Sequence, residues 1–337
     1  MRKRSESIEK YKDIGRNVKN LFDFLADIKD LEKRREITEY INAHPEEFGE
    51  FLESLFNKSG LEPEKMKQKL LELTDFLNNR LAVSIIKQAI DDNNSLIRVR
   101  ALQAAYRTRI DSLNERIIQI LDNQNEEFEA RKWALHILAS TDSKGFGSKL
   151  RRIARNSSEN TEIRKEAIFS LTNIENDKTI GTLCALLGDF NVEIRQSGAW
   201  ALAQIGSSES INCLLAALED EDTEVRDWAI RGLRDIDDSR ALQGLADTLE
   251  TVAPKEQVRM IRLIIDRRSE IVLRAIAQLL TSNDVNVRRQ AAWAMGVAPY
   301  PPAAGSLEIL LEDSDEQVRN YAEVALTRIG PVDPTDL

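Results

Sequence analysis

The stretch VEIRQSGAWALAQIG, residues 192–206, decides the fold because close copies of it return along the chain. The copies TEVRDWAIRGLRDI (223–236), VNVRRQAAWAMG (285–296) and EQVRNYAEVALTRIG (316–330) share an arginine that opens an apolar, alanine-rich helix. Steps of 33, 33, 31, 31, 33, 29 and 31 residues separate the eight arginines Arg98, Arg131, Arg164, Arg195, Arg226, Arg259, Arg288 and Arg319. This period is typical of a solenoid, in which each unit buries its apolar face against its neighbours.

Each repeat is expected to hold two helices, A and B, with helix B beginning near the arginine. Four residues before the arginine stands Asn or Asp in six of the eight copies, and both are favoured N-cap residues. No alternation typical of strands persists along the chain. The sequence therefore predicts an all-α solenoid of helical hairpins.

The domain organisation follows from where the repeat is present. Residues 1–80 do not carry it, but apolar residues at helical spacing and two prolines predict helices over about 8–28, 31–43, 46–58 and 63–79. We expect residues 1–80 to form a helical cap or docking segment. Residues 81–330 then hold about eight repeats, and residues 331–337 form a short tail.

The repeated arginine is expected to be structural. At about 100° per residue, it projects to the same side of helix B as the apolar positions −1, +3 and +7, counted from the arginine. A guanidinium on a packed face is tolerated only when it is paired and hydrogen bonded. The eight arginines are therefore expected to form a ladder that bonds to acidic, amide or backbone oxygens.

The opposite side of helix B carries large side chains. Position +5 projects away from the packed face, and position +2 lies next to position +5 on the same outward side of the helix. B helices of such solenoids line the concave surface, where an apolar strip marks a docking site. We expect partner binding at Phe169, Trp200 and Trp293, with Trp133, Trp228, Tyr321, Arg231 and Ile264 beside them. The alternative, that the tryptophans only pack between B helices, can hold at the same time.

The units resemble HEAT repeats, in particular the short variety named after phycobilisome lyases. The motif VRxxAAxALxxIG is matched by Val225 and Arg226, by Ala291 and Ala292, and by Ile205 and Gly206. This resemblance covers about residues 81–330 and implies a HEAT-like α-solenoid, a right-handed superhelix of helical hairpins. The sixth unit departs from the motif, since Arg262 and Asp266 replace the usual alanine and leucine. We expect a bend, a repacked pair or a functional site there.

Catalytic and cofactor motifs are missing from the sequence. Its two histidines form no HExxH or His-Glu pair, so the iron-dependent hydroxylase activity of some HEAT-repeat proteins is not expected. No CxxC, GxxxxGK[ST] or GxGxxG occurs, so we expect no metal site and no cofactor. Cys184 and Cys213 lie in apolar helical runs and are expected to be separate buried thiols rather than a disulfide. With no apolar h-region after the basic N-terminus, the sequence predicts a cytoplasmic protein.

The charge distribution bears on the partner. Residues 219–337 carry 23 acidic and 14 basic side chains, which accounts for most of the net charge of −10. We therefore expect a protein partner whose bound segment carries Lys or Arg, and the same surplus disfavours nucleic acid. The function predicted is a non-catalytic scaffold or adaptor that binds on the concave surface.

Two alternatives stay open. One is a chromophore (bilin) lyase-like or chaperone role, which ultraviolet-visible absorption of the purified protein would report. The other is a HEAT-like DNA-repair glycosylase or nucleic-acid binder, which a salt-dependent gel shift would report.

Overall fold

In the computed structural model, all secondary structure of the described residues is helical. The described residues are 35, 38–39, 41–43, 45–109, 111–140, 146–174 and 176–330. The helix predicted over residues 8–28 and the tail over 331–337 lie outside them. The chain divides into two compact units, Met1–Phe146 and Gly147–Leu337. No helix among the described residues is long and apolar enough to cross a membrane.

The first unit consists of three described hairpins. They are α4 (Pro45–Phe56) with α5 (Leu61–Leu73), α6 (Asn79–Ala89) with α7 (Ser95–Thr108), and α8 (Asn114–Asp122) with α9 (Phe128–Ser140). Helix α4 packs on α6, while α5 packs on α7 and α7 on α9, so the hairpins are stacked in register. The pair α4 and α5 falls within the predicted cap, yet it packs on the next pair as the later hairpins do.

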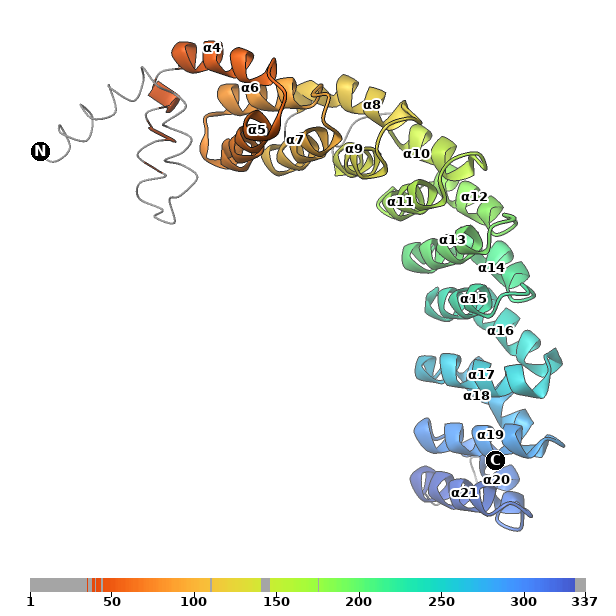
Figure 1. Cartoon of the computed structure of the whole chain (residues 1–337). Coiled ribbons are helices and arrows are strands. Elements are labelled where there is room, and N and C mark those ends of the chain that lie inside the picture. Colours follow the sequence, from red (N-terminus) through yellow and green to blue (C-terminus); the bar gives the residue numbers. More distant parts are fainter. Residues whose placement is uncertain are drawn as a thin grey trace, which may run out of the picture. The chain divides into compact units, whose positions relative to one another are not determined.

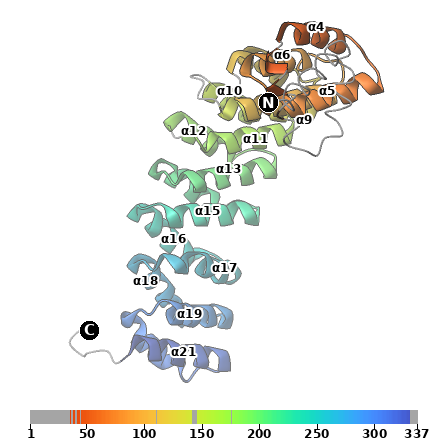
Figure 2. The ribbon, with the colours of Figure 1, turned by 90° about the vertical axis from the view of Figure 1, so that its left-hand side faces the viewer.

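The second unit continues the same architecture in two layers (Figures 1 and 2). The A helices are α10 (Phe146–Arg155), α12 (Asp177–Leu186), α14 (Ile211–Ala217), α16 (Ser239–Thr251), α18 (Glu270–Gln278) and α20 (Ala304–Leu310). The B helices are α11 (Thr161–Leu171), α13 (Val192–Ile205), α15 (Thr223–Asp235), α17 (Pro254–Ile264), α19 (Val285–Val297) and α21 (Glu316–Ile329). Each B helix packs on the next one, so the six form a single layer. The predicted all-α solenoid is confirmed.

Side-chain caps define where most B helices begin. Asn191 accepts a hydrogen bond from the backbone N–H of Glu193, and Asp222 accepts from those of Glu224 and Val225. The same arrangement caps the helices that follow Asn94, Asn160, Asp284 and Asp315. All six Asn and Asp residues predicted from the sequence are therefore N-caps, and each satisfies backbone donors that the helix itself leaves free.

An arginine–aspartate ladder joins successive repeats. Arg195 is 8% exposed; its Nε donates to Asp220 Oδ2 at 2.9 Å, and its Nη1 donates to the carbonyl oxygen of Asp189 at 3.1 Å. Asp189 in turn accepts from Arg164 of the preceding repeat, and Asp220 lies 25 residues after Arg195, as Asp189 does after Arg164. Each aspartate thus links two repeats, because its carboxylate serves one arginine and its carbonyl serves the next.

The same geometry occurs at both ends of the described chain. Near the C-terminus, Arg288 Nε donates to Asp313 Oδ2 at 2.7 Å, and this hydrogen bond holds the pKa of Asp313 below its ordinary value. In the first unit, Lys67 on α5 stands 31 residues before Arg98 and donates to Asp92 Oδ2 at 2.6 Å. Both side chains of this pair are buried, and Arg98 donates to the carbonyl oxygen of Asp92. Lys67 therefore occupies the arginine position of the hairpin α4/α5.

Candidate functional site

The sixth repeat of the sequence series is shifted by two residues relative to the arginine period. Helix α17 begins after Ala253 and not after Lys255, the residue four positions before Arg259. At the ladder position stands Gln257, which is buried and donates from Nε2 to the carbonyl oxygen of Leu249 at 3.0 Å. Counted to Gln257, both neighbouring steps from Arg226 and to Arg288 become 31 residues. The steps of 33 and 29 residues on either side of Arg259 arise because Arg259 is not the ladder residue of its repeat.

This shift corrects two predicted residues. Arg259 is not part of the ladder: its side chain is 38% exposed, and its Nε donates to Asp227 Oδ1 at 2.6 Å. Ile264 is completely buried, so it cannot contact a partner at the surface. With Gln257 as the reference, Ile264 takes the apolar +7 position and Arg262 takes the outward +5 position. The sixth unit is therefore a repacked repeat, and its unexpected outward residue is Arg262.

Arg226 is affected by the shift, because the next repeat has no aspartate at the ladder position. It keeps the two backbone carbonyls of its own turn, but it reaches Glu256 Oε1 at 2.9 Å for want of an aspartate equivalent to Asp220. Its buried Nε has no hydrogen-bond partner. Unlike Arg195, whose Nε donates to Asp220, Arg226 thus leaves its Nε unbonded, and its side chain is 18% exposed.

The outward sides of the six B helices of the second unit form a surface that we call the B-helix face. On it, Phe169 and Trp200 of adjacent repeats stack with ring centroids 5.5 Å apart and planes inclined by 7°. Phe169 remains 56% exposed despite this contact. One repeat further, the guanidinium of Arg231 lies over the ring of Trp228 at 5.1 Å. Phe169 and Trp200 are therefore neighbours across repeats, and all five predicted aromatic residues of this unit are exposed or half-buried.

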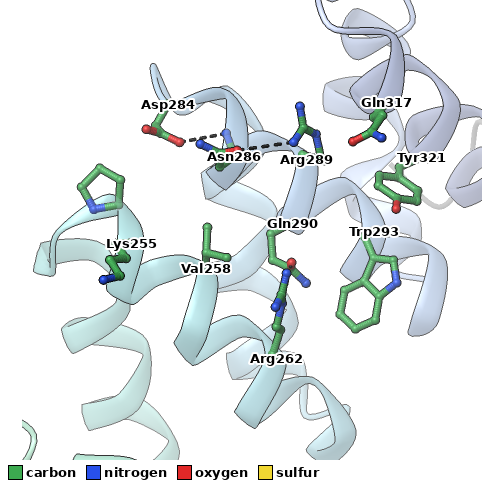
Figure 3. A pocket seen from close by; sticks show the side chains of 11 residues that line it. Lys255, Val258, Arg262, Asp284, Asn286, Arg289, Gln290, Trp293, Gln317 and Tyr321 are labelled. Carbon is green, nitrogen blue, oxygen red and sulfur yellow. Dashed lines mark hydrogen bonds between the residues drawn. The ribbon is translucent and has the colours of Figure 1, made fainter. Parts of the chain in front are cut away.

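A hollow of about 810 Å³ lies on the same face between α17, α19 and α21 (Figure 3). Trp293 and Tyr321 contribute aromatic walls, and Arg262, Arg289 and Lys255 contribute cations. Arg262 donates from Nε to Gln290 Oε1 at 2.9 Å, and Arg289 donates from Nη2 to Asp315 Oδ2 at 2.8 Å. Sequence reasoning missed Arg262 and Lys255 as surface residues here, because it placed both in the wrong register.

The first unit carries a separate aromatic cluster. Trp133 on α9 makes edge-to-face contacts with Tyr106, at 5.7 Å between ring centroids, and with His136, at 5.6 Å. Trp133 and His136 are half-buried and Tyr106 is exposed. Trp133 thus packs against its neighbours along and between B helices, as the alternative interpretation of the tryptophans requires, and still presents part of its surface.

Five acidic side chains of the C-terminal region are engaged within the fold. Asp220 and Asp313 serve the ladder, while Asp222, Asp284 and Asp315 cap helices. The hydrogen bond from Gln196 holds the pKa of Asp222 below its ordinary value. These five carboxylates are committed to hydrogen-bond partners within the chain.

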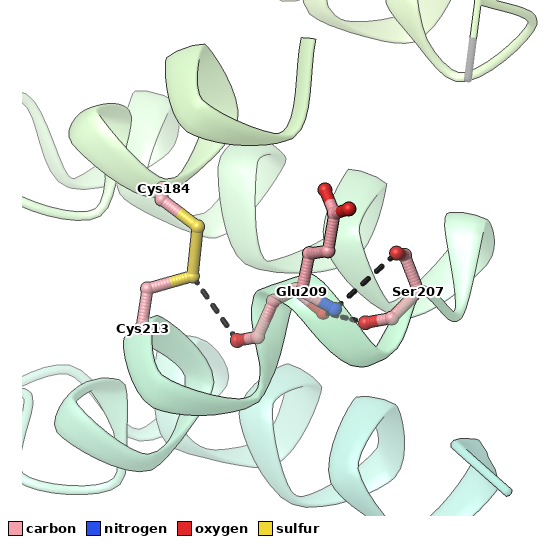
Figure 4. Close-up of a disulfide and its surroundings, with 5 residues drawn as sticks. Cys184, Ser207, Glu209 and Cys213 are labelled. Atoms are coloured by element: carbon pink, nitrogen blue, oxygen red, sulfur yellow. Dashed lines mark hydrogen bonds between the residues drawn. A yellow bond between two sulfur atoms is a disulfide. The ribbon is translucent and has the colours of Figure 1, made fainter. Parts of the chain in front are cut away.

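The two cysteines are not separate thiols. Cys184 on α12 and Cys213 on α14 are joined by a disulfide with a Cα–Cα distance of 5.6 Å (Figure 4). They are 29 residues apart, which is close to one repeat, so they occupy neighbouring positions on successive A helices. The prediction of free buried cysteines is wrong because it considered each helix alone.

Comparison with known proteins agrees with this geometry. A family model described as HEAT repeats matches residues 148–234, 182–256 and 242–327, which together span more than half of the chain. No curated protein matches the chain in sequence.

Three solved structures of low sequence identity have a similar fold. A Kap121p mutant is 12% identical with a TM-score of 0.54, over 93% of this chain and 41% of that chain. Kap95p in a complex with RanGDP is 12% identical with a TM-score of 0.51, over 97% and 48%. Importin beta is 14% identical with a TM-score of 0.50, over 92% and 50%. The chain spans half or less of these three proteins, and at such identities the likeness concerns the fold alone.

Proposed function

We propose that this chain, which belongs to the HEAT-repeat family, is a non-catalytic scaffold or adaptor that binds a protein partner on its B-helix face. The observation that carries the proposal is the stack of Phe169 and Trp200, which leaves Phe169 more than half exposed. Aromatic side chains dominate the energy of many protein interfaces, and contiguous exposed apolar patches mark interaction sites. Kap95p, a neighbour with a similar fold, binds RanGDP.

The proposed docking residues follow from position on the B-helix face. Phe169, Trp200 and Trp293 lie at +5, with Trp228 and Tyr321 at +2, and Arg231 stacks on Trp228. Trp133 is the equivalent residue of the first unit. We also propose that the repeats belong to the short, phycobilisome-lyase-like variety, on the strength of the VRxxAAxALxxIG motif.

The compartment remains a prediction that the disulfide can test. A reducing cytoplasm would keep Cys184 and Cys213 as thiols, whereas an oxidising compartment would hold them as the disulfide of the structure. Alkylation of the protein at the moment of cell lysis, followed by mass spectrometry, distinguishes the two states.

The function is tested by capture of the partner and by matched alanine variants. The partner captured by the wild-type chain is identified by mass spectrometry and purified, and its affinity is measured for Phe169→Ala and Trp200→Ala. Ile309→Ala is the control, since Ile309 lies on the A helix α20 and is 72% exposed. We expect a loss of about 2 kcal/mol in binding free energy for a hot-spot aromatic and no change for the control. If the aromatic variants melt lower than wild type and bind the partner normally, these residues pack the repeats and the proposal fails.

A further inference from the structure

The hollow between α17, α19 and α21 differs in charge from the rest of the C-terminal region. Residues 219–337 carry a surplus of acidic side chains, yet this hollow is lined by three cations and one carboxylate, that of Asp284. Asp284 caps its own helix, where it accepts from the backbone N–H of Asn286 at 2.8 Å and of Val287 at 3.1 Å. Its carboxylate is therefore hydrogen bonded at the start of α19, and no ion pair joins it to the three cations among the described residues (Figure 3).

The three cations differ in their hydrogen bonds and ion pairs. Arg289 is paired with Asp315 and also contacts Asn286. Arg262 bonds only to the neutral amide of Gln290, and no ion pair joins it to a carboxylate in the described part of the chain. Lys255 is exposed, and its side chain makes no hydrogen bond or ion pair with the described residues. Arg262 and Lys255 therefore leave two positive charges without a carboxylate partner in the same hollow.

The aromatic walls lie beside these charges. Arg262 and Gln290 lie in the middle of the hollow, with Lys255 on one side and Trp293 and Tyr321 on the other (Figure 3). A guanidinium binds a carboxylate through two parallel hydrogen bonds, and an indole ring covers an apolar side chain. A volume of about 810 Å³ lies within the range of about 300–1,000 Å³ that pockets for small ligands have, which is enough for one or two side chains of a bound segment.

We propose that this hollow binds an acidic segment of the partner protein, with Asp or Glu carboxylates at Arg262 and Lys255 and an adjacent apolar side chain against Trp293. The inference rests on the proposed function and gives the chemistry of the partner at this one place. It differs from the preference for a Lys- or Arg-bearing segment that the net charge of the region suggests. The hollow presents cations because the sixth repeat is shifted, which brings Arg262 to the outward position.

The test uses three fluorescein-labelled peptides of one length, measured by fluorescence anisotropy with the full chain. The first alternates glutamate with leucine and glycine, and the other two replace every glutamate with glutamine or with lysine. We expect the glutamate peptide to bind most tightly and to weaken as salt is added. Arg262→Glu and Lys255→Glu should each lower its affinity by about tenfold, as the loss of a charge-assisted hydrogen bond and the new repulsion require. Arg274→Glu makes the same charge change on the A helix α18 and should leave the affinity unchanged.

The outcomes separate this inference from the proposed function. If the glutamine or lysine peptide binds as tightly as the glutamate peptide and Trp293→Ala still weakens it, the face is a docking surface and the acidic preference is wrong. If inorganic phosphate displaces the glutamate peptide at concentrations as low as those of the peptide itself, the hollow takes small anions and the inference is overturned. If neither Trp293→Ala nor Arg262→Glu changes the binding of any peptide, docking at this hollow is refuted together with the acidic preference.

Discussion

Replacement of Arg195 by alanine should destabilise the chain strongly, because it removes one partner of a buried pair. Arg195 and Asp220 are both 10% exposed in their side chains and share hydrogen bonds of 2.9 and 3.2 Å. Alanine leaves the Asp220 carboxylate with the backbone N–H of Asp222 and leaves the Asp189 carbonyl without the guanidinium. Breaking a buried pair from one side costs about 3–5 kcal/mol, and the small residual exposure favours the lower end.

The remaining contact of Arg195 adds little. Its Nη2 lies 3.0 Å from Glu221, whose side chain is 86% exposed, and such exposed pairs contribute about 0–1 kcal/mol. We therefore expect Arg195→Ala to lower the free energy of unfolding by about 3 kcal/mol. The matched control is Lys165→Ala, which removes an exposed link to Glu193 of the next repeat and should cost less than about 1 kcal/mol.

The assay is urea unfolding followed by circular dichroism, combined with hydrogen exchange. Because a repeat array can unfold in parts, exchange should rise most for the amides of α13 and α15, the helices that Arg195 and its turn join. A double-mutant cycle with Asp220→Ala should show a coupling of more than about 1 kcal/mol. A destabilisation by Arg195→Ala no larger than that of Lys165→Ala would refute the ladder as a source of stability.

The remaining predictions concern the shifted repeat, the disulfide and acid stability. Gln257→Ala should cost about 1–3 kcal/mol by stranding a buried carbonyl, whereas Arg259→Ala should cost less than about 1 kcal/mol in the same urea assay; the reverse order would contradict the register. Reduction of the Cys184–Cys213 disulfide should lower the free energy of unfolding by about 2–4 kcal/mol, and equal melting temperatures with and without reductant would disprove it. Asp313 has a pKa below its unfolded value, so its contribution is present above that value and is lost as pH falls below about 4. Asp313→Asn should flatten this acid-induced loss, and an unchanged pH profile would show that the residue does not contribute.

The fold was predictable from the sequence because its signals are local and repeated. Asn191 and Asp222 cap helices at equivalent turns, and Arg195 and Arg226 follow these caps at the same distance. A short-range pattern that returns every 31 residues or so predicts both the helix starts and the packed face. The burial of Arg195 follows from the same projection.

The errors arose where one repeat lacks the residue that marks the others. In the sixth repeat, Gln257 takes the position that the arginine has in the other repeats. Arg259, two residues later, was therefore mistaken for the ladder arginine. Equal steps of 31 residues would have indicated Gln257, and the same step back from Arg98 would have found Lys67. The register of a repeat is set by the residue that makes the ladder hydrogen bond, whatever its type. In the sequence, that residue can be found only by comparing the lengths of successive steps.

The amino-acid composition does not show which acidic residues and cysteines pair between neighbouring repeats. The acidic residues of the C-terminal third suggest a negatively charged surface, but Asp220 and Asp313 face arginines of neighbouring repeats. The disulfide likewise joins two A helices whose contact depends on how the repeats stack. Such long-range partners follow from the period only when residues one repeat apart are considered together.

The central claim is that the partner binds on the B-helix face, and site-directed photo-cross-linking tests this claim most directly. A photoreactive amino acid is placed singly at Phe169 or Val324, which are exposed on the B helices α11 and α21, and at Ile309 on the A helix α20. With the purified partner, we expect cross-links from Phe169 and Val324 and none from Ile309. Cross-links from Ile309 with none from the two B-helix positions would place the partner on the A helices and contradict the account.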